Sequence, residues 1–242
     1  MTVFEMAKQV LSGTGATLFI FFSTIIFSLP LGLVMAFCRM SKIKILKSII
    51  SFSISILRGT PLMLQLIVWF FGPYYIFRIP LKSTWRILSI VLGFSINYAA
   101  YFAEIFRAGI LSIDIGQFEA AKVIGYNKVQ TFIKIIFPQM VKRVLPPVTN
   151  EIITLIKDTS LAFVIAYSEL FTIAKQVASA RSTVIPLFIA GIFYYVFNFI
   201  VAFVMERIEK SLDYYKIGKY LKYKIVKKTL VIILFFMIFH FV

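Results

Sequence analysis

Long apolar runs, separated by short polar and basic stretches, make up most of this chain. A helix needs about 20 mainly apolar residues to cross the ~30 Å hydrocarbon core of a bilayer. Several runs reach that length, so the pattern predicts an all-α polytopic membrane protein with five core transmembrane helices. The expected spans are residues 14–40, 49–76, 86–106, 148–171 and 184–205.

Shorter segments flank these spans. Residues 1–13 form an amphipathic N-terminal lead-in, and residues 112–146 form a long connection that we expect outside the bilayer. Residues 211–242 form a basic tail that ends in a short apolar segment at 229–242. As a helix this segment would be only about 21 Å long, which favours a place in the membrane interface over a sixth span.

Composition supports the membrane assignment and limits the possible contacts. Hydrophobic residues make up 60% of the chain and charged residues 15%, whereas a soluble domain carries about 25% charge. The net charge of +16 comes from 26 Lys and Arg against 10 Asp and Glu. These basic residues flank the apolar runs, as they do in cytoplasmic loops of membrane proteins. The charge therefore indicates contact with membrane lipid and no contact with nucleic acid.

The positions of the basic residues also predict the topology. Lys and Arg gather after the first span, in the loop at 112–146 and in the tail. The positive-inside rule places these three regions on the cytoplasmic side. The N-terminus is then outside and the C-terminus inside.

Several kinds of chemistry are absent from the sequence. The chain has one cysteine, Cys38, and one histidine, His240, so it cannot form an internal disulfide or a Cys/His metal cluster. It has no GxxxxGK(S/T) stretch to cradle nucleotide phosphates. No nucleophile–base pair is recognisable, so we expect no catalytic residue and no cofactor bound by this chain. If ATP is used, another chain binds it.

The second span contains polar residues that are candidates for a substrate pathway. They are Arg58, Thr60 and Gln65, beside a kink expected at Pro61. A charge at the bilayer centre costs about 2.5–3.5 kcal/mol on insertion scales, so Arg58 must face protein or a water-filled path. A structural kink, with the Arg clamping a neighbouring helix, explains the pattern equally well.

The third span carries a second polar set. Asn97, Tyr101 and Glu104 follow each other at i, i+4 and i+7, which places them on one helix face directed inward. Ala99 and Ala103 form a small-xxx-small pair suited to close helix packing. The polar face is a candidate part of the substrate pathway, and hydrogen bonding between helices is the alternative.

The fourth span holds the preferred ligand cluster. Adjacent residues on a helix diverge by about 100°, so the acid and base at 157–158 need different partners or a local break. Glu169 lies eighteen residues after Glu151, five full turns, and should return to the same face. A buried ion pair with neighbouring helices is the alternative to ligand binding. The cluster consists of Lys157, Asp158, Thr159 and Ser160.

The loop at 112–146 reads as two short helices. Asp114 or Gly116 can start the first, and Gly125 can end it as the residue after the C-cap. Asn127 then caps the second, with Gln130 in capping-box position. Pro138 is expected to stop this second helix.

Several motifs resemble those of a known family. Glu119-Ala120-Ala121, Gly125 and Pro138 resemble the EAA motif in the cytoplasmic loop of ATP-binding-cassette (ABC) importer permeases. Five further stretches resemble the polar amino acid permeases of this group, the histidine/glutamine/arginine-type family. These are Arg58-Gly59-Thr60-Pro61-Leu62, Ala103-Glu104-Ile105-Phe106-Arg107, Gly116-Gln117, Phe137-Pro138-Gln139 and Lys157-Asp158-Thr159-Ser160-Leu161.

The resemblance implies a type I importer transmembrane domain over residues 14–210, in a bacterial cytoplasmic membrane. Residues 119–124 would be the coupling helix, and the EAA-motif residues would couple to the ATPase. The implied partners are an ABC ATPase subunit dimer that binds ATP-Mg, a second permease copy or homologue, and an extracytoplasmic amino acid-binding protein. The tail after Leu221 lies beyond the family pattern.

Together these features predict the permease subunit of an importer for a polar or charged amino acid. An ATP-independent secondary transporter or channel would explain the intramembrane charges, but it gives no reason for a capped two-helix loop. A membrane enzyme lacks the expected catalytic groups. Arg58 can meet a carboxylate and Asp158 an amine, which suits a zwitterion. This does not choose among glutamine, glutamate, histidine, arginine, lysine and cystine.

Overall fold

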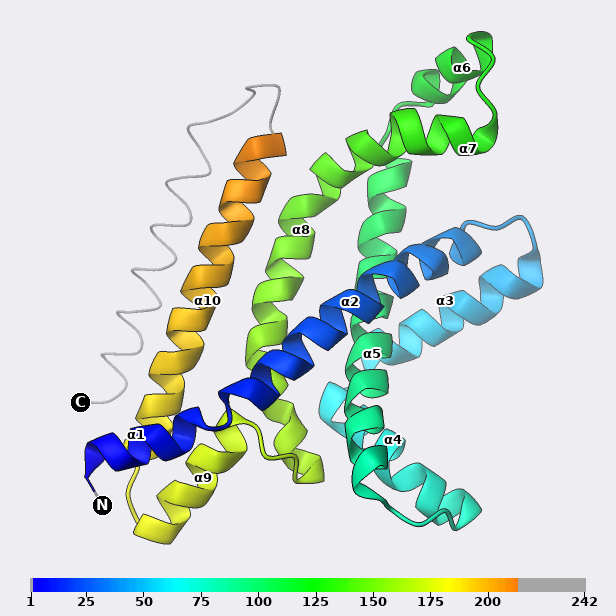
Figure 1. The fold of residues 1–242 in the computed structure, drawn as a ribbon. Coiled ribbons are helices and arrows are strands. Elements are labelled where there is room, and N and C mark those ends of the chain that lie inside the picture. The colour runs from blue at the N-terminus through cyan, green and yellow to red at the C-terminus, as the bar shows by residue number, and fades with distance from the viewer. Residues whose placement is uncertain (1, 213–242) are drawn as a thin grey trace.

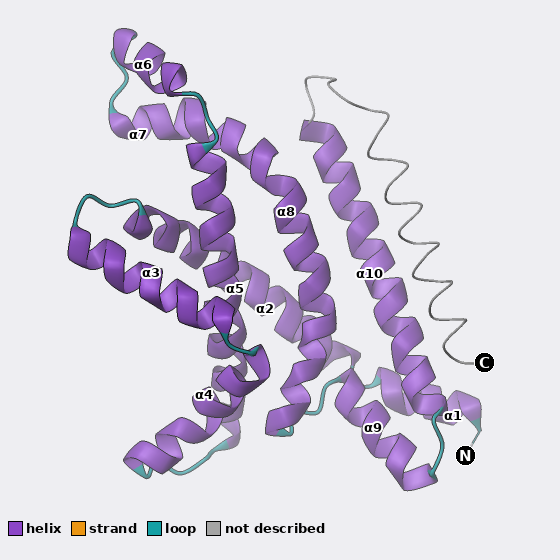
Figure 2. Ribbon diagram, turned by 180° about the vertical axis from the view of Figure 1, so that it is seen from behind, coloured by secondary structure: helices purple, strands orange, loops and turns teal. Residues whose placement is uncertain are grey.

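The computed structural model describes residues 2–212, and this range consists of helices and connecting loops without a β-strand (Figure 2). The expectations for the tail beyond residue 212, including the apolar segment at 229–242, lie outside the described residues. Three helical stretches are long and apolar enough to cross a membrane, and two bent helix pairs raise the number to five if each pair is one span. The predicted all-α polytopic fold is confirmed.

Helices α1 (Val3–Leu11) and α2 (Thr14–Arg39) form the N-terminal part of the fold. Thr2 and Glu5 make a capping box at the start of α1, which packs against α9 (Leu170–Arg181) and α10 (Ile185–Leu212). A β-carbon on Gly13, between α1 and α2, would lie 2.6 Å from the backbone nitrogen of Leu170. Glycine therefore allows the chain to pass directly over the start of α9.

The expected span at 49–76 is two helices, α3 (Lys44–Gly59) and α4 (Leu62–Phe77), which meet at 109°. The expectation of one kinked helix is therefore corrected. Thr60 precedes Pro61 and takes an extended conformation, with φ −120° and ψ 146°. The proline ring disfavours helical geometry at the preceding residue, so α3 ends here instead of bending.

Helix α5 (Ser83–Leu111) is the central element, and α2, α3, α4 and α8 (Phe137–Asp158) all pack against it (Figures 1 and 2). Ala99 and Ala103 are fully buried. A β-carbon on Gly32 of α2 would lie 3.0 Å from the carbonyl oxygen of Ala99. The close packing predicted for the small-residue pair is thus present, between α5 and α2.

The loop expected at 112–146 is shorter than predicted. It contains α6 (Ile115–Val123) and α7 (Lys128–Thr131), which continues through a π-helical turn (Phe132–Ile136) into α8. Pro138 does not stop a helix but is the second residue of α8. In this wider turn the N–H of Phe137 donates to the carbonyl of Phe132. The turn leads into α8 at Pro138, which has no N–H of its own to donate.

The expected span at 148–171 is also interrupted. α8 ends at Asp158, a 3-10 helix follows at Thr159–Ile165, and α9 starts only after a loop. Glu169 is the N-cap of α9 and not part of the helix that carries Glu151. The predicted return of Glu169 to the face of Glu151 is therefore wrong, because the regular 3.6-residue period does not extend across the break.

Helix α10 closes the described chain and lies beside α8 (Figure 1). It buries few of its side chains, namely Pro186 and Ala190. Large apolar residues such as Phe188, Ile192 and Phe199 are exposed along it. A helix that is apolar on its exposed face is suited to contact with lipid.

Candidate functional site

The loop formed by α6 and α7 stands at one end of the molecule, and α1 and α9 lie at the other end (Figure 1). Asp114 starts α6, and its carboxylate accepts a hydrogen bond from the N–H of Gly116 at 2.7 Å. Gly125 follows the C-cap of α6 with φ +81°. The N–H of Tyr126 donates to the carbonyl of Ala121 at 3.0 Å, which completes a Schellman motif.

The start of α7 is capped in the same local way. The side-chain oxygen of Asn127 accepts from the N–H of Gln130 at 2.9 Å, and the Gln130 side chain accepts from the N–H of Asn127 at 3.0 Å. The predicted capping box and the predicted C-terminal role of Gly125 are confirmed. Both helix ends therefore satisfy their backbone groups within the loop itself.

The outer surface of α6 exposes apolar and acidic side chains together. Glu119 and Ala120 are exposed, Val123 is 88% exposed and Ile124 is 63% exposed. Ala121 is fully buried, so it packs inside the chain and offers no surface to a partner. Exposed apolar side chains at a loop tip are typical of a docking surface.

Pro138 is exposed at the start of α8, next to this loop. Its neighbour Gln139 donates from Nε2 to Oε1 of Gln117 in α6 at 3.1 Å. Nε2 of Gln139 also donates to the carbonyl of Ile135 at 3.0 Å. The start of α8 is therefore bonded directly to α6, so a force on the loop can reach α8.

Three predicted pathway residues, Thr60, Gln65 and Asn97, meet at the break between α3 and α4. Nε2 of Gln65 and Nδ2 of Asn97 both donate to the carbonyl of Leu57, at 2.8 and 3.1 Å. Nδ2 of Asn97 also donates to Oε1 of Gln65 at 3.0 Å, and the hydroxyl of Thr60 donates to the carbonyl of Ile56 at 2.9 Å. These side chains satisfy the terminal carbonyls of α3, as helix ends require. This bonding gives them a structural task, and a role in cargo binding stays a prediction.

The preferred ligand cluster lies at the end of α8, where the helix changes to a 3-10 turn. The hydroxyl of Tyr98 in α5 donates to Oδ2 of Asp158 at 2.7 Å. Thr159 and Ser160 donate their hydroxyls to backbone carbonyls of Ile156 and Lys157, each at 2.7 Å. A local break, one of the two options predicted for the adjacent charges, is present directly after Asp158.

Exposure separates the two charges of this cluster. The Lys157 side chain is exposed, whereas Asp158 is half-buried. Tyr98 is only 2% exposed and is not among the site residues predicted from the sequence. Its spacing of one residue from Asn97 placed it off the predicted face, so only the packing of α5 against α8 reveals its contact.

A charged cluster surrounds Glu104 near the end of α5 that leads to α6. Glu104 forms ion pairs with Arg39 at the end of α2 and with Arg107 one turn further along α5. The guanidinium of Arg58 lies over the ring of Tyr101, 5.3 Å from its centroid. Arg39 and Arg107 were not selected from the sequence, although the i, i+3 spacing of Glu104 and Arg107 is a recognisable pairing signal.

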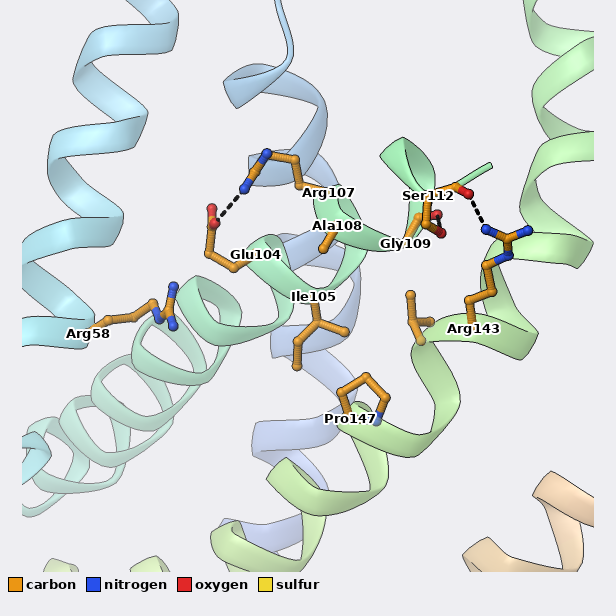
Figure 3. A pocket seen from close by; sticks show the side chains of 10 residues that line it. Arg58, Glu104, Ile105, Arg107, Ala108, Gly109, Ser112, Arg143 and Pro147 are labelled. Atoms are coloured by element: carbon orange, nitrogen blue, oxygen red, sulfur yellow. Dashed lines mark hydrogen bonds and ion pairs between the residues drawn. The ribbon is translucent and has the colours of Figure 1, made fainter. Parts of the chain in front are cut away.

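Two open cavities flank this cluster. The larger, of about 620 Å³, is lined by residues of α3, α5 and α8, with Arg58 and Arg143 on opposite sides (Figure 3). The smaller, of about 310 Å³, lies between α2, α3 and α5 and is lined by Arg39, Arg58 and Glu104 among others. Neither is lined by Asp158, so the structure divides the predicted pathway residues into separate groups. Within residues 2–212, no set of three or more His, Cys, Asp or Glu side chains is placed to hold a metal ion.

Comparisons with known proteins agree with this architecture. The L-cystine transport system permease protein of Bacillus subtilis (strain 168) is 38% identical over 192 residues, covering 78% of this chain and 80% of that protein. The arginine transport system permease protein of the same organism is 36% identical over 204 residues, covering 84% and 92%. A putative glutamine transport system permease protein of Rickettsia felis is 33% identical, also covering 84% and 92%.

Solved structures show the same fold. The crystal structure of an amino acid ABC transporter with histidines is 30% identical, with a TM-score of 0.77 over 87% of this chain and 99% of that chain. An inward-facing methionine ABC transporter is 17% identical, with a TM-score of 0.67 over 86% and 95%, and supports the fold alone. The family described as "binding-protein-dependent transport system inner membrane component" matches residues 28–214. The chain, with its EAA-like loop, its candidate membrane-spanning helices and these relatives, belongs to that family.

Proposed function

We propose that this chain is the permease subunit of an ABC importer that carries a polar or charged amino acid across the bacterial cytoplasmic membrane, driven by a separate ATPase subunit. The relatives named above are permease proteins for L-cystine, arginine and glutamine. The single observation that carries the proposal is the α6–α7 loop. A locally capped loop with exposed apolar side chains needs a partner outside the bilayer.

The loop supplies the coupling step. Glu119 and Ala120 lie exposed on α6 beside the apolar tip at Val123 and Ile124, where an ATPase subunit can dock. Gln139 bonds α8 to α6, and α8 carries the intramembrane acid Asp158. ATP binding and hydrolysis by the partner would shift the equilibrium between two packings of the same helices through different contacts at the loop. The permease itself performs no chemistry.

The cargo groups lie along α8 and α5. Asp158, fixed by Tyr98, and Glu151 two turns earlier supply carboxylates that suit the ammonium group of an amino acid. Arg58 lies close enough to Glu151 for an electrostatic interaction and suits a carboxylate. Acids and bases along one path favour a zwitterionic cargo. Lys157, Tyr101 and Glu104 complete the pathway set in this proposal.

The partners follow from the same assignment. We infer a dimer of ATPase subunits that bind ATP-Mg, a second permease copy or homologue, and an extracytoplasmic binding protein. This chain binds no cofactor. The loop end faces the cytoplasm, so the N-terminus lies outside and the C-terminus inside. The exposed apolar face of α10 contacts lipid.

The proposal is tested by purifying the chain after co-expression with the ATPase and binding-protein genes of its own genome. We expect a stable complex and ATP-dependent uptake of labelled amino acids into proteoliposomes. Glu119→Lys should reduce uptake about tenfold or more, because it reverses a charge on the docking surface. Glu206→Lys, which reverses an exposed charge on α10 that pairs with Lys210, is the control.

Uptake that continues without the ATPase would instead favour an ATP-independent secondary transporter or channel. The similarity to a transport system permease protein and to an amino acid ABC transporter does not favour that alternative. Normal uptake by Glu119→Lys in a fully inserted chain would contradict the assignment of α6 as the coupling helix.

A further inference from the structure

The larger cavity, near the α6–α7 end of the molecule, has a strong excess of positive charge. Three arginines line it, each from a different helix: Arg58 from α3, Arg107 from α5 and Arg143 from α8 (Figure 3). The one acidic residue in its lining is Glu104. Glu104 is already ion-paired with Arg39 and Arg107. The carboxylate therefore does not neutralise the remaining guanidinium groups.

Several hydrogen-bond donors of these arginines are not used within the described chain. Nε of Arg107 is buried and has no hydrogen-bond partner there. Arg143 uses one guanidinium nitrogen to donate to the backbone carbonyl of Ser112, out of five N–H donors. Arg58 stacks its guanidinium group on the Tyr101 ring. The N–H donors at the edge of this group remain available to a ligand. A ligand with oxygen acceptors would satisfy these groups, including the buried Nε of Arg107.

The position of the cavity relates it to the cargo groups on α8. Pro147 lines the cavity and lies one turn before Glu151 on the same helix. At 1.5 Å per residue, Arg143 lies about 12 Å along α8 from Glu151, toward the loop end. The ammonium and carboxylate groups of one amino acid are only a few bonds apart. A cargo molecule whose carboxylate reaches Arg143 therefore has its ammonium group away from Glu151, whereas Arg58 lies near enough to Glu151 to be met together with it.

We propose that the cavity lined by Arg58, Arg107 and Arg143 is a carboxylate-binding exit site. It receives the α-carboxylate of the cargo after the ammonium group has left Glu151 and Asp158. The planar guanidinium groups match the two oxygens of a carboxylate. The inference rests on the proposed function. A free anion from the cytoplasm, such as inorganic phosphate, offers the same chemistry from another source, and the experiment separates the two.

The first test measures occupancy directly in the purified complex in lipid nanodiscs. Phenylglyoxal modifies accessible arginines, and mass spectrometry of peptides gives the rate at Arg58 and Arg143. We expect millimolar L-glutamine to slow modification of both, and L-glutaminamide, which lacks the α-carboxylate, to leave it unchanged. Arg181, exposed on α9 at the other end, is the internal reference. Equal protection by the amide, or no protection by glutamine, would overturn the exit site.

Inorganic phosphate distinguishes the source of the ligand. If the cargo carboxylate is the natural ligand, phosphate should protect less than L-glutamine at equal concentration. Stronger protection by phosphate would assign the cavity to a cytoplasmic anion and overturn the cargo assignment.

The second test measures transport. L-Glutamine present on the ATPase side should inhibit uptake, and Arg143→Gln should raise the half-inhibitory concentration about tenfold, the size of one charge-assisted contact. Arg143→Lys should recover part of the effect. Lys44→Gln removes an exposed charge at the start of α3 and should retain wild-type inhibition. Unchanged inhibition in Arg143→Gln would contradict the inference.

The proposed function and the exit site can be refuted separately. A wild-type complex without ATP-dependent uptake would refute the proposed function and the exit site with it. A complex with normal ATP-dependent uptake, but with no carboxylate-specific protection at Arg58 and Arg143, would refute the exit site alone.

Discussion

Two interruptions of the helical path, the α6–α7 loop and the α3–α4 break, are stabilised in opposite ways. In the loop, each cap comes from within five residues: Asn127 bonds Gln130, and Gly125 allows the turn that ends α6. At the break, the carbonyl of Leu57 receives a hydrogen bond from Asn97 of α5, forty residues along the chain. The caps of the loop therefore come from the loop itself, whereas those of the break come in part from the core.

This difference suits two different tasks. A loop that satisfies its own backbone groups can keep its shape while a partner pulls on it, so it can transmit a displacement. A break whose caps come from a central helix is held at a fixed angle to that helix. Its angle can change only if Gln65 and Asn97 lose their shared bonds. The loop is therefore suited to transmit a displacement, and the break is suited to hold α3 and α4 at a fixed angle.

The largest expected effect comes from disrupting the turn of the loop with Gly125→Val. Gly125 has φ +81°, a conformation that costs a β-branched residue about 1–3 kcal/mol. We expect ATP-dependent uptake to fall about tenfold or more, with normal membrane insertion. Gly191→Val is the control, because that glycine lies in α10 with open space around it and no positive φ. An equal loss of uptake in both variants would show that the positive φ at Gly125 is not the cause.

Removing the long-range cap should destabilise the fold itself. In Asn97→Leu, Oε1 of Gln65 loses its donor in a half-buried place, and we expect a loss of about 1–3 kcal/mol in unfolding free energy. Thermal unfolding of the purified protein in detergent measures it. Asn150→Leu, an exposed asparagine on α8, is the matched substitution. If Asn97→Leu unfolds at the same temperature as the wild type, the break does not depend on α5.

The smallest expected effect is local. Asn127→Ala removes the N-cap of α7, which costs about 1 kcal/mol of helix stability. Because the loop is capped independently of the core, the global unfolding midpoint should stay near that of the wild type, while hydrogen exchange of the α7 amides becomes faster. A global loss as large as that of Asn97→Leu would remove the distinction between the two interruptions.

Local signals carried much of the prediction from sequence. The apolar runs predict a polytopic all-α protein, and the caps at Gly125 and Asn127 are correct because capping involves residues three to five positions apart. The prediction that Pro138 ends a helix is wrong, since a π-helical turn before it accommodates the proline. At Thr60 the sequence predicts only a kink. After Asp158 it predicts a break only as one of two ways to accommodate the adjacent charges.

The grouping of the polar side chains could not be predicted. Tyr98 and Asp158 are sixty residues apart and meet only because α5 packs against α8. Arg58, Arg107 and Arg143 come from three helices and share one cavity. Periodicity gives the face of a single helix, but it does not say which face of another helix lies opposite.

Apolar length and helix caps depend on neighbouring residues, so a bundle of membrane helices with a separately capped loop can be predicted from the amino-acid order. Which polar residues hold helix ends, and which remain open to a ligand, depends on how the helices pack. Asn97 and Gln65 turn to the carbonyls of α3, whereas Arg143 and Arg58 face a cavity. That choice depends on which backbone groups a neighbouring helix leaves unsatisfied, and this is known only when the helices are packed together.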